Sequence, residues 1–208
     1  MGKYTKVKLI LLGDTYTGKS SILDMYKNNN FNGNTSATIG VDFVKSTIKK
    51  DNNDYSLYIW DTSGQEKFNS IILSYYRNIS VIVLVFDLSN RKTFDNLRKW
   101  LLDISHYSNE NVIIKLIGNK CDKPKIISIN EIKDFCYNNN ISFYSYLEVS
   151  AKNNINIDKI FNDIVNELDF KINNCLIEHN SKNGLTIVTE MELEENRINK
   201  KNKCCVFL

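Results

Sequence analysis

Short apolar runs alternate with amphipathic helical patterns along most of this chain, and this alternation constrains its fold more than any other feature. The strand-like segments are residues 7–12, 43–50, 55–60, 81–87, 112–118 and 142–149. The helix-like segments are residues 20–27, 94–104, the stretch opened by a capping box at 128–131, and 157–172. Alternating strands and helices form βαβ units. We therefore expect an α/β fold, with a mostly parallel six-stranded sheet flanked by helices and one antiparallel edge from the 43–60 hairpin.

The pattern also divides the chain. Its 208 residues favour one folded domain, which we expect at residues 1–172. Residues 173–203 are polar, mixed in charge and without sustained periodicity, which predicts a flexible tail before a short motif at 204–208. A net charge of +3 argues against nucleic acid as a partner. We expect neither a transmembrane helix nor a signal peptide, and hence a cytosolic location.

A glycine-rich motif, here called the phosphate loop, lies between the first predicted strand and the first predicted helix. It reads Gly13-Asp14-Thr15-Tyr16-Thr17-Gly18-Lys19-Ser20 and fits G-x-x-x-x-G-K-[ST] at every position. Backbone N–H groups of such a loop cradle phosphates, and the helix N-terminus adds its dipole. Lys19 would face the outer phosphates and Ser20 would ligate Mg²⁺, with Ser21 next in the nucleotide site. The motif predicts a P-loop NTPase fold and leaves the base open.

Two polar segments after later strands indicate which base is bound. They are Asn119-Lys120-Cys121-Asp122 and Ser150-Ala151-Lys152. Ligands bind outside the carboxyl ends of such strands. The Asp122 carboxylate can accept hydrogen bonds from N1–H and the 2-amino group of guanine, and adenine would leave it unpaired at a cost on the order of 10³-fold. With Lys120 along the base and residues 150–152 at its oxygen, we predict bound GTP or GDP.

A third set of residues is predicted to sense the outer phosphate. Asp61 follows the strand at residues 55–60 and can hold Mg²⁺ through a water, while the N–H of Gly64 can approach the γ-phosphate. Gln65 is the predicted catalytic residue, because glutamine orients the attacking water in such enzymes. Thr38 is the predicted second protein ligand of Mg²⁺, and Phe31 is placed to flank the base.

These residues resemble the Ras superfamily, and the Rab family within it, over about residues 5–172 and at the C-terminus. The Rab-like segments are Thr-Ile-Gly-Val-Asp-Phe at 38–43, Trp-Asp-Thr-Ser-Gly-Gln-Glu at 60–66, Ser-Tyr-Tyr-Arg at 74–77 and a terminal double cysteine. The resemblance implies that Phe43, Trp60 and Tyr75 form an aromatic effector-binding patch between two switch loops. Core packing is the alternative for these three side chains.

The resemblance further implies a monomeric switch in intracellular vesicle trafficking. GTP bound to Thr38 and Gly64 would order the switch loops for effectors, and hydrolysis would release them. The implied partners are an exchange factor, a GTPase-activating protein, a GDP-dissociation inhibitor and a Rab escort protein. Thr15-Tyr16-Thr17 departs from the Ser-Gly-Val usual in the family. We expect slow intrinsic hydrolysis, on the order of 10⁻⁴ to 10⁻² per second.

The last residues predict a lipid anchor. Cys205-Val206-Phe207-Leu208 fits C-a-a-X, and a terminal Leu favours geranylgeranyl. Cys204 offers a second prenylation site, as the resemblance to Rab endings implies. Two lipid chains give stable membrane binding where one is marginal. The resemblance thus places the protein in the cytosol and on the cytoplasmic face of an endomembrane.

Three other functions remain open at this stage. A GTP-binding scaffold with negligible hydrolysis is compatible with the unusual Thr15-Tyr16-Thr17, although Gln65 argues against it. A phosphate-loop kinase is disfavoured by Asp122 and by residues 150–152. A Ras or Rho signalling switch is disfavoured by the Val41-Asp42-Phe43 run and the double cysteine.

Overall fold

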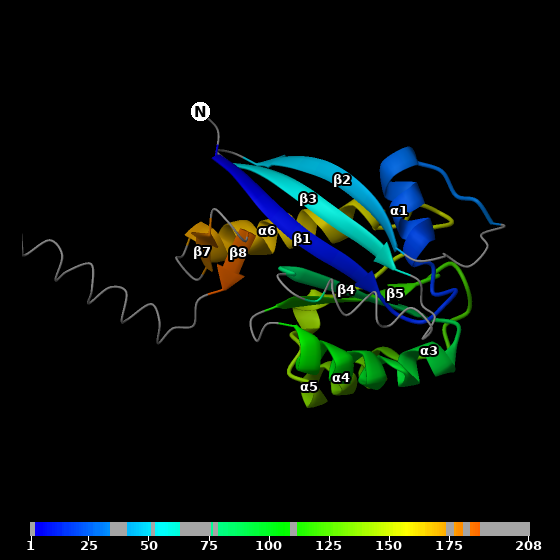
Figure 1. The fold of residues 1–208 in the computed structure, drawn as a ribbon. Coiled ribbons are helices and arrows are strands. Elements are labelled where there is room, and N and C mark those ends of the chain that lie inside the picture. The colour runs from blue at the N-terminus through cyan, green and yellow to red at the C-terminus, as the bar shows by residue number, and fades with distance from the viewer. Residues whose placement is uncertain are drawn as a thin grey trace, which may run out of the picture.

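Six strands form one sheet in the order β2-β3-β1-β4-β5-β6 (Figure 1). The computed structural model describes residues 3–33, 41–50, 53–62, 76, 79–108, 112–173, 177–180 and 184–187. The strands are β1 (Lys3–Leu12), β2 (Val41–Lys50), β3 (Asn53–Thr62), β4 (Val81–Asp87), β5 (Ile113–Asn119) and β6 (Tyr146–Glu148). Only the β2–β3 pair in this sheet is antiparallel. The predicted six-stranded, mostly parallel sheet is confirmed.

Helices cover both faces of this sheet. They are α1 (Lys19–Asn28), α3 (Arg91–Asp95), α4 (Leu97–Tyr107), α5 (Ile129–Asn138) and α6 (Ile157–Asn173). Helices α1 and α6 lie on one side and α3, α4 and α5 on the other (Figure 1). Helices α3 and α4 thus connect β4 to β5, and α5 connects β5 to β6, as helical crossovers of βαβ units.

The core has two halves, one on each face. Leu9 and Leu11 of β1 pack in the cluster with α1 and α6, whereas Ile10 and Leu12 pack in the cluster with α4 and α5, and all four are 0% exposed. Successive side chains of a strand point to opposite faces, so a strand covered on both sides must be apolar throughout. This explains the continuous apolar runs in the sequence.

Two predicted elements differ from those observed. The helix predicted at residues 94–104 is two helices, α3 and α4, and the Asn90 side chain caps the first by accepting from the Lys92 N–H. The strand predicted at 142–149 begins with a 3₁₀ turn, Phe143–Ser145, followed by the short β6. Tyr144 is 97% exposed, so its β-propensity has no packing surface to act on.

The C-terminal segment predicted to be a flexible tail contains a hairpin. Strands β7 (Ile177–Asn180) and β8 (Gly184–Ile187) pair antiparallel in a sheet of their own. β8 lies beside β1, and β7 lies beside α6. The polar composition of this segment did not predict the hairpin. Within the part of the chain that the structure describes, no helix has the length and apolar character needed to cross a membrane.

Candidate nucleotide-binding site

The phosphate loop contains two glycines where a side chain would not fit. A Cβ on Gly13 would lie 2.1 Å from the Val85 carbonyl oxygen of β4, and one on Gly18 would lie 2.3 Å from the Asn119 side-chain nitrogen. Their φ angles of 137° and 93° also fall in the region that favours glycine. The loop therefore packs directly against β4 and against the polar segment at the end of β5.

Lys19 begins α1 and is held by the loop that precedes it. Its Nζ donates to the Gly13 carbonyl at 2.8 Å and to the Asp14 carbonyl at 2.9 Å. Burial lowers the pKa of Lys19 to about 8, against the opposing effect of the Asp61 and Asp14 charges. A phosphate beside this ammonium would favour its charged form, so the buried lysine suits an anionic ligand.

Ser20 and Asp61 meet across the phosphate loop. The Ser20 hydroxyl donates to Oδ2 of Asp61, the next-to-last residue of β3, which is 4% exposed. The other carboxylate oxygen, Oδ1, is buried without a hydrogen-bond partner among the described residues. Burial raises the pKa of Asp61 to about 6, although the Ser20 hydrogen bond and the Lys19 charge oppose this. An orphaned carboxylate oxygen beside a serine hydroxyl fits the oxygen donors that Mg²⁺ prefers.

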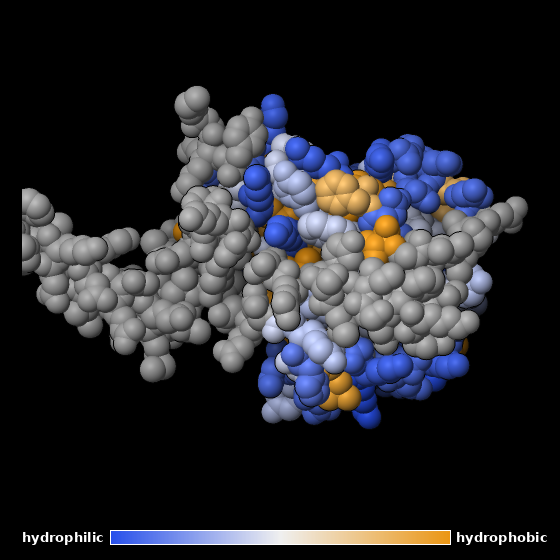
Figure 2. Space-filling view, viewed as in Figure 1, coloured by the Kyte–Doolittle hydropathy of each residue, from blue (hydrophilic) through white to orange (hydrophobic). Residues whose placement is uncertain are grey.

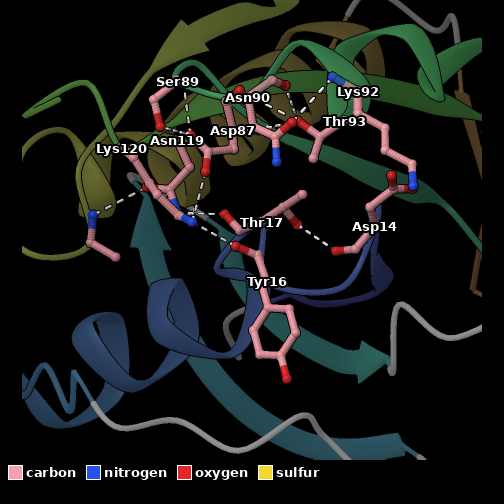
Figure 3. Close-up of polar contacts among 11 residues, drawn as sticks. Asp14, Tyr16, Thr17, Asp87, Ser89, Asn90, Lys92, Thr93, Asn119 and Lys120 are labelled. Atoms are coloured by element: carbon pink, nitrogen blue, oxygen red, sulfur yellow. Dashed lines mark hydrogen bonds and ion pairs between the residues drawn. The ribbon is translucent and has the colours of Figure 1, made fainter. Parts of the chain in front are cut away.

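Asn119 and Lys120 tie the end of β5 to the phosphate loop. The Asn119 Nδ2 donates to the Thr17 carbonyl at 2.8 Å, and its Oδ1 accepts from the Ala151 N–H at 3.3 Å. The Lys120 Nζ donates to the Tyr16 carbonyl at 2.6 Å. Two segments about a hundred residues apart in sequence therefore form one hydrogen-bonded frame (Figure 3).

Asp122 lies at a cleft beside this frame. Ser150, which is 0% exposed, donates from Oγ to Asp122 Oδ1 at 2.5 Å and so fixes the carboxylate. The cleft has a volume of about 370 Å³. It is lined by Tyr16, Gly18, Ser21, Phe31, Asn32, Gly33, Asn119, Lys120, Asp122, Lys123, Ala151 and Lys152. The structure thus brings together the predicted base-binding residues, including Phe31 and Lys152, at the mouth of the phosphate loop.

Asp87 is a site residue that the sequence analysis missed. It ends β4, is 5% exposed, and pairs through Oδ2 with the Lys120 Nζ at 2.8 Å (Figure 3). Its Oδ1 accepts from the N–H and the hydroxyl of Ser89. Burial alone would raise the pKa of Asp87, but the hydrogen bonds from Lys120 and Ser89 hold it below its ordinary value. The sequence signal that could have indicated Asp87 is a single aspartate at the C-terminal end of a strand whose other residues are apolar.

Asp14 was predicted to bind the nucleotide, yet its carboxylate contacts α4. The Trp100 Nε1 donates to Oδ1 at 2.9 Å, and the Asn96 Nδ2 donates to Oδ2 at 2.6 Å. Trp100 is 8% exposed and packs in the cluster with α4 and α5. The hydrogen bond from its indole to the phosphate loop could not be read from helical spacing.

Comparison with known proteins supports the same assignment as the geometry. The Ras family matches residues 8–170. Ras-related protein Rab-1 of Theileria parva is 41% identical over 168 residues, which cover 79% of this chain and 75% of that protein. Ras-related protein Rab-10 of Caenorhabditis elegans is 40% identical over 159 residues, 76% of this chain and 78% of that protein. Ras-related protein SEC4 of Candida albicans is 34% identical over 203 residues, 96% of this chain and 93% of that protein.

The chain is a Rab-type member of the Ras family. Members of this family bind and hydrolyse GTP, so the Rab-type chain is a GTPase. The predicted family and fold class are confirmed. The alternatives, a GTP-binding scaffold with negligible hydrolysis and a Ras or Rho signalling switch, are not favoured, and neither is a phosphate-loop kinase.

Tyr16 is unusual within the phosphate loop of this Rab-type protein. Its φ of 65° lies in the left-handed region, and its side chain is 69% exposed. The ring points away from the polar cluster, whereas the carbonyl points to Lys120 (Figure 3). Of its neighbours, Thr15 is half-buried and Thr17 is fully buried, with its hydroxyl on the Asp14 carbonyl at 2.9 Å.

Two aromatic residues of the predicted effector patch pair across the β2–β3 hairpin. Phe43 and Trp60 are opposite each other in the antiparallel register, with ring centroids 5.5 Å apart. Phe43 is 47% exposed, and Trp60 is half-buried against the core. Figure 2 shows apolar surface among polar side chains over β2 and β3. Trp60 therefore combines the two roles considered for it, surface and core.

Several predicted residues lie outside the described part of the chain. They are Thr38, Gly64 and Gln65 of the switch loops, Tyr75 of the effector patch, and Cys204 and Cys205 of the lipidation motif. Their assignments stay predictions.

Proposed function

We propose that this Rab-type GTPase works as a GTP/GDP switch in vesicle trafficking, with the guanine base in the cleft at Asp122. The observation that carries the proposal is the Asp122 carboxylate, fixed by buried Ser150 beside a phosphate loop. A fixed carboxylate can accept hydrogen bonds from the two N–H donors of guanine. Adenine lacks both donors and would leave the carboxylate unpaired. The cleft volume of about 370 Å³ suits a ligand of nucleoside size.

The phosphates would lie along the loop between Gly13 and Ser20. Lys19 supplies a buried positive charge there, and the N-terminus of α1 has no acidic residue in its first turn to repel an anion. Lys120 and Asn119 keep the loop backbone in place through the carbonyls of Tyr16 and Thr17. The chain thus binds phosphate mainly with preformed backbone, which costs little reorganisation.

We propose Ser20, Asp61 and Thr38 as the residues that hold Mg²⁺, with Asp61 acting through a water. The buried Oδ1 of Asp61 supports this, because a carboxylate oxygen without a partner is costly unless it meets a cation or a water. When bound, Mg²⁺ neutralises charge on the outer phosphates.

Hydrolysis is assigned to Gln65, which would orient the attacking water. Loss of the γ-phosphate would release Thr38 and Gly64 and with them the switch loops. Intrinsic turnover would be slow, on the order of 10⁻⁴ to 10⁻² per second.

The proposed partners follow from the Rab-type assignment. Effectors would bind the GTP form at Phe43, Trp60 and Tyr75. An exchange factor, a GTPase-activating protein, a GDP-dissociation inhibitor and a Rab escort protein would run the cycle. Prenyl groups on Cys204 and Cys205 would hold the monomer on the cytoplasmic face of an endomembrane, in exchange with the cytosol.

Titration calorimetry tests the base assignment. We expect GDP to bind the purified protein with Mg²⁺ at least about 10³-fold more tightly than ADP. Asp122→Asn should weaken GDP binding by about 10²-fold or more, because the amide cannot accept both N–H donors. Asp134→Asn, at an exposed position of α5, is the matched control and should bind as wild type. Equal affinity for GDP and ADP would overturn the proposal.

Single-turnover hydrolysis tests the catalytic role proposed for Gln65. A preloaded GTP complex should convert to GDP within hours at the proposed rate, and Gln65→Leu should slow this by about 10-fold or more. A wild-type complex that retains GTP as long as the Gln65→Leu variant does would contradict the role proposed for Gln65.

A further inference from the structure

Asp14 places a negatively charged carboxylate within a loop that binds phosphates, and this carboxylate is hydrogen-bonded by residues outside the loop. Asp14 follows Gly13 in the phosphate loop, and its own backbone carbonyl accepts from Lys19 Nζ at 2.9 Å and from Thr17 Oγ1 at 2.9 Å. A carboxylate in such a loop would repel phosphate if it turned inward, since like charges within several ångströms interact unfavourably even at a protein surface. In the structure both of its oxygens are occupied from outside the loop.

Both of these contacts come from one end of α4. Asn96, at the N-terminal cap position of the helix, donates to Oδ2 at 2.6 Å, and Trp100, one turn later, donates to Oδ1 at 2.9 Å. Residues four apart lie on the same face of a helix, so the two donors form a pair aimed at a single carboxylate. Leu97 and Ile104 are buried in the core and fix the helix that presents them.

We propose that Asn96 and Trp100 are positioning residues of the nucleotide site, which hold the Asp14 carboxylate away from the bound phosphates. The inference rests on the proposed guanine-nucleotide site and adds a function for α4. The two donors replace the water that a turned-out carboxylate would otherwise need. By holding the Asp14 side chain, the two donors also keep the Asp14 backbone carbonyl where it accepts from Lys19. Helix α4 thus supports the phosphate loop through the Asp14 side chain.

The position of Trp100 could also reflect core packing alone. Its indole is 8% exposed among apolar neighbours, and a tryptophan N–H usually finds a partner when buried. Packing alone, however, gives no reason for Asn96 to take the second oxygen of the same carboxylate. A role in restraining charge also predicts something that packing does not: the effect of losing either donor should vanish when Asp14 itself is removed.

The test is a mutant cycle read by GDP dissociation. Trp100→Phe keeps an aromatic ring and removes the N–H, and Asn96→Ala removes the second donor. Each should speed release of a fluorescent GDP analogue from the Mg²⁺ complex by about 10-fold, the worth of one hydrogen bond to a charged group. Asn138→Ala, at an exposed position of α5, is the control for Asn96→Ala and should release GDP at the wild-type rate.

The double variants decide between restraint of charge and packing. In an Asp14→Ala background, adding Trp100→Phe or Asn96→Ala should change the GDP release rate by less than about twofold, because no carboxylate remains to turn inward. The effect of the single variants should also shrink as NaCl rises from 20 to 500 mM, since salt screens the freed charge. Circular dichroism of each variant shows that it has folded.

The outcomes separate this inference from the proposed function. If wild type fails to bind GDP, the guanine site itself is wrong. If wild type binds GDP and the single variants release it at the wild-type rate, Asn96 and Trp100 have no positioning role. Equal acceleration in the presence and absence of Asp14 would assign both residues to packing and overturn the proposal.

Discussion

Two residues at the nucleotide site adopt backbone conformations that side chains disfavour. Tyr16 has φ 65° and Lys120 has φ 62°. One interaction joins them, because the Lys120 ammonium donates to the Tyr16 carbonyl at 2.6 Å and pairs with Asp87 at 2.8 Å. Non-glycine residues persist in the left-handed region when surrounding contacts fix them, and such residues cluster at functional sites. Here the fixing contact is an ion pair between a half-buried Lys120 and a buried Asp87.

Replacing Tyr16 should show the cost of this conformation. We expect Tyr16→Gly to raise the free energy of unfolding by about 0.5–1 kcal/mol, because glycine removes about 1–2 kcal/mol of left-handed strain and loses part of that gain in chain entropy. Urea unfolding measures the change. Tyr137→Gly is the matched control: Tyr137 is 85% exposed in the last turn of α5, where glycine should destabilise instead. A decrease in stability on Tyr16→Gly would contradict the strain.

Asp87 offers a second prediction at this scale. Asp87→Asn removes the charge that holds Lys120, so GDP should dissociate about 10-fold faster. Stopped-flow release of a labelled GDP measures this rate. Asp95→Asn is the control, because that carboxylate is 62% exposed and lies 4.0 Å from Arg91, so its loss should leave release within about twofold. An unchanged rate in Asp87→Asn would remove Asp87 from the site.

At the scale of elements, α5 begins with a capping box that links it to α3. The Ser128 N–H donates to Glu131 at 2.9 Å, and the Glu131 N–H donates back to the Ser128 hydroxyl at 3.3 Å. Arg91 of α3 also donates to Glu131, at 2.6 Å. The Ser128 backbone, followed by the Arg91 and Ser128 side chains, lowers the pKa of Glu131 to about 2.

The lowered pKa predicts an acid-sensitive contribution to stability. A carboxyl group whose pKa is depressed on folding stabilises the protein above its unfolded pKa, near 4.5, and loses this effect as the pH falls toward 2. Glu131→Gln should therefore be less stable than wild type at pH 6, with the difference narrowing at pH 3. Urea unfolding at the two pH values measures it. A difference that stays constant or grows on acidification would be inconsistent with the Glu131 assignment.

The sequence predicted helices and strands well where a single local pattern, such as continuous burial or a capping box, determines the element. Runs buried on both faces, such as Val81–Asp87, could be read directly, and so could the capping box at Ser128 and Glu131. The 3₁₀ turn at Phe143–Ser145 could not, because aromatic composition predicts a strand whatever the residues pack against. The break between α3 and α4 depends on Asn90 capping a short helix, a signal too local for apolar spacing to detect.

At the scale of the whole molecule, the nucleotide site lies at the carboxyl ends of β1, β4 and β5, where loops from distant parts of the chain meet. Short motifs predicted its phosphate and base residues because each motif carries its own chemistry. The contacts that join the motifs were not predictable, since Asp14 meets Trp100, and Lys120 meets Asp87, only after the sheet has formed. The sequence therefore indicated what the site binds, and the fold shows what holds the site in shape.

A ligand that binds at the ends of these strands should stabilise the whole molecule, because every loop of the site must be folded to bind it. At a free GDP concentration of about 1,000 times the dissociation constant, binding adds about 4 kcal/mol, which should raise Tm by roughly 8–16 °C for a domain of this size. Differential scanning fluorimetry with Mg²⁺ measures the shift, and ADP at the same concentration is the control. Asp122→Asn should lose most of the shift while its ligand-free Tm stays near that of wild type. An equal shift with ADP would show that the cleft does not distinguish the base.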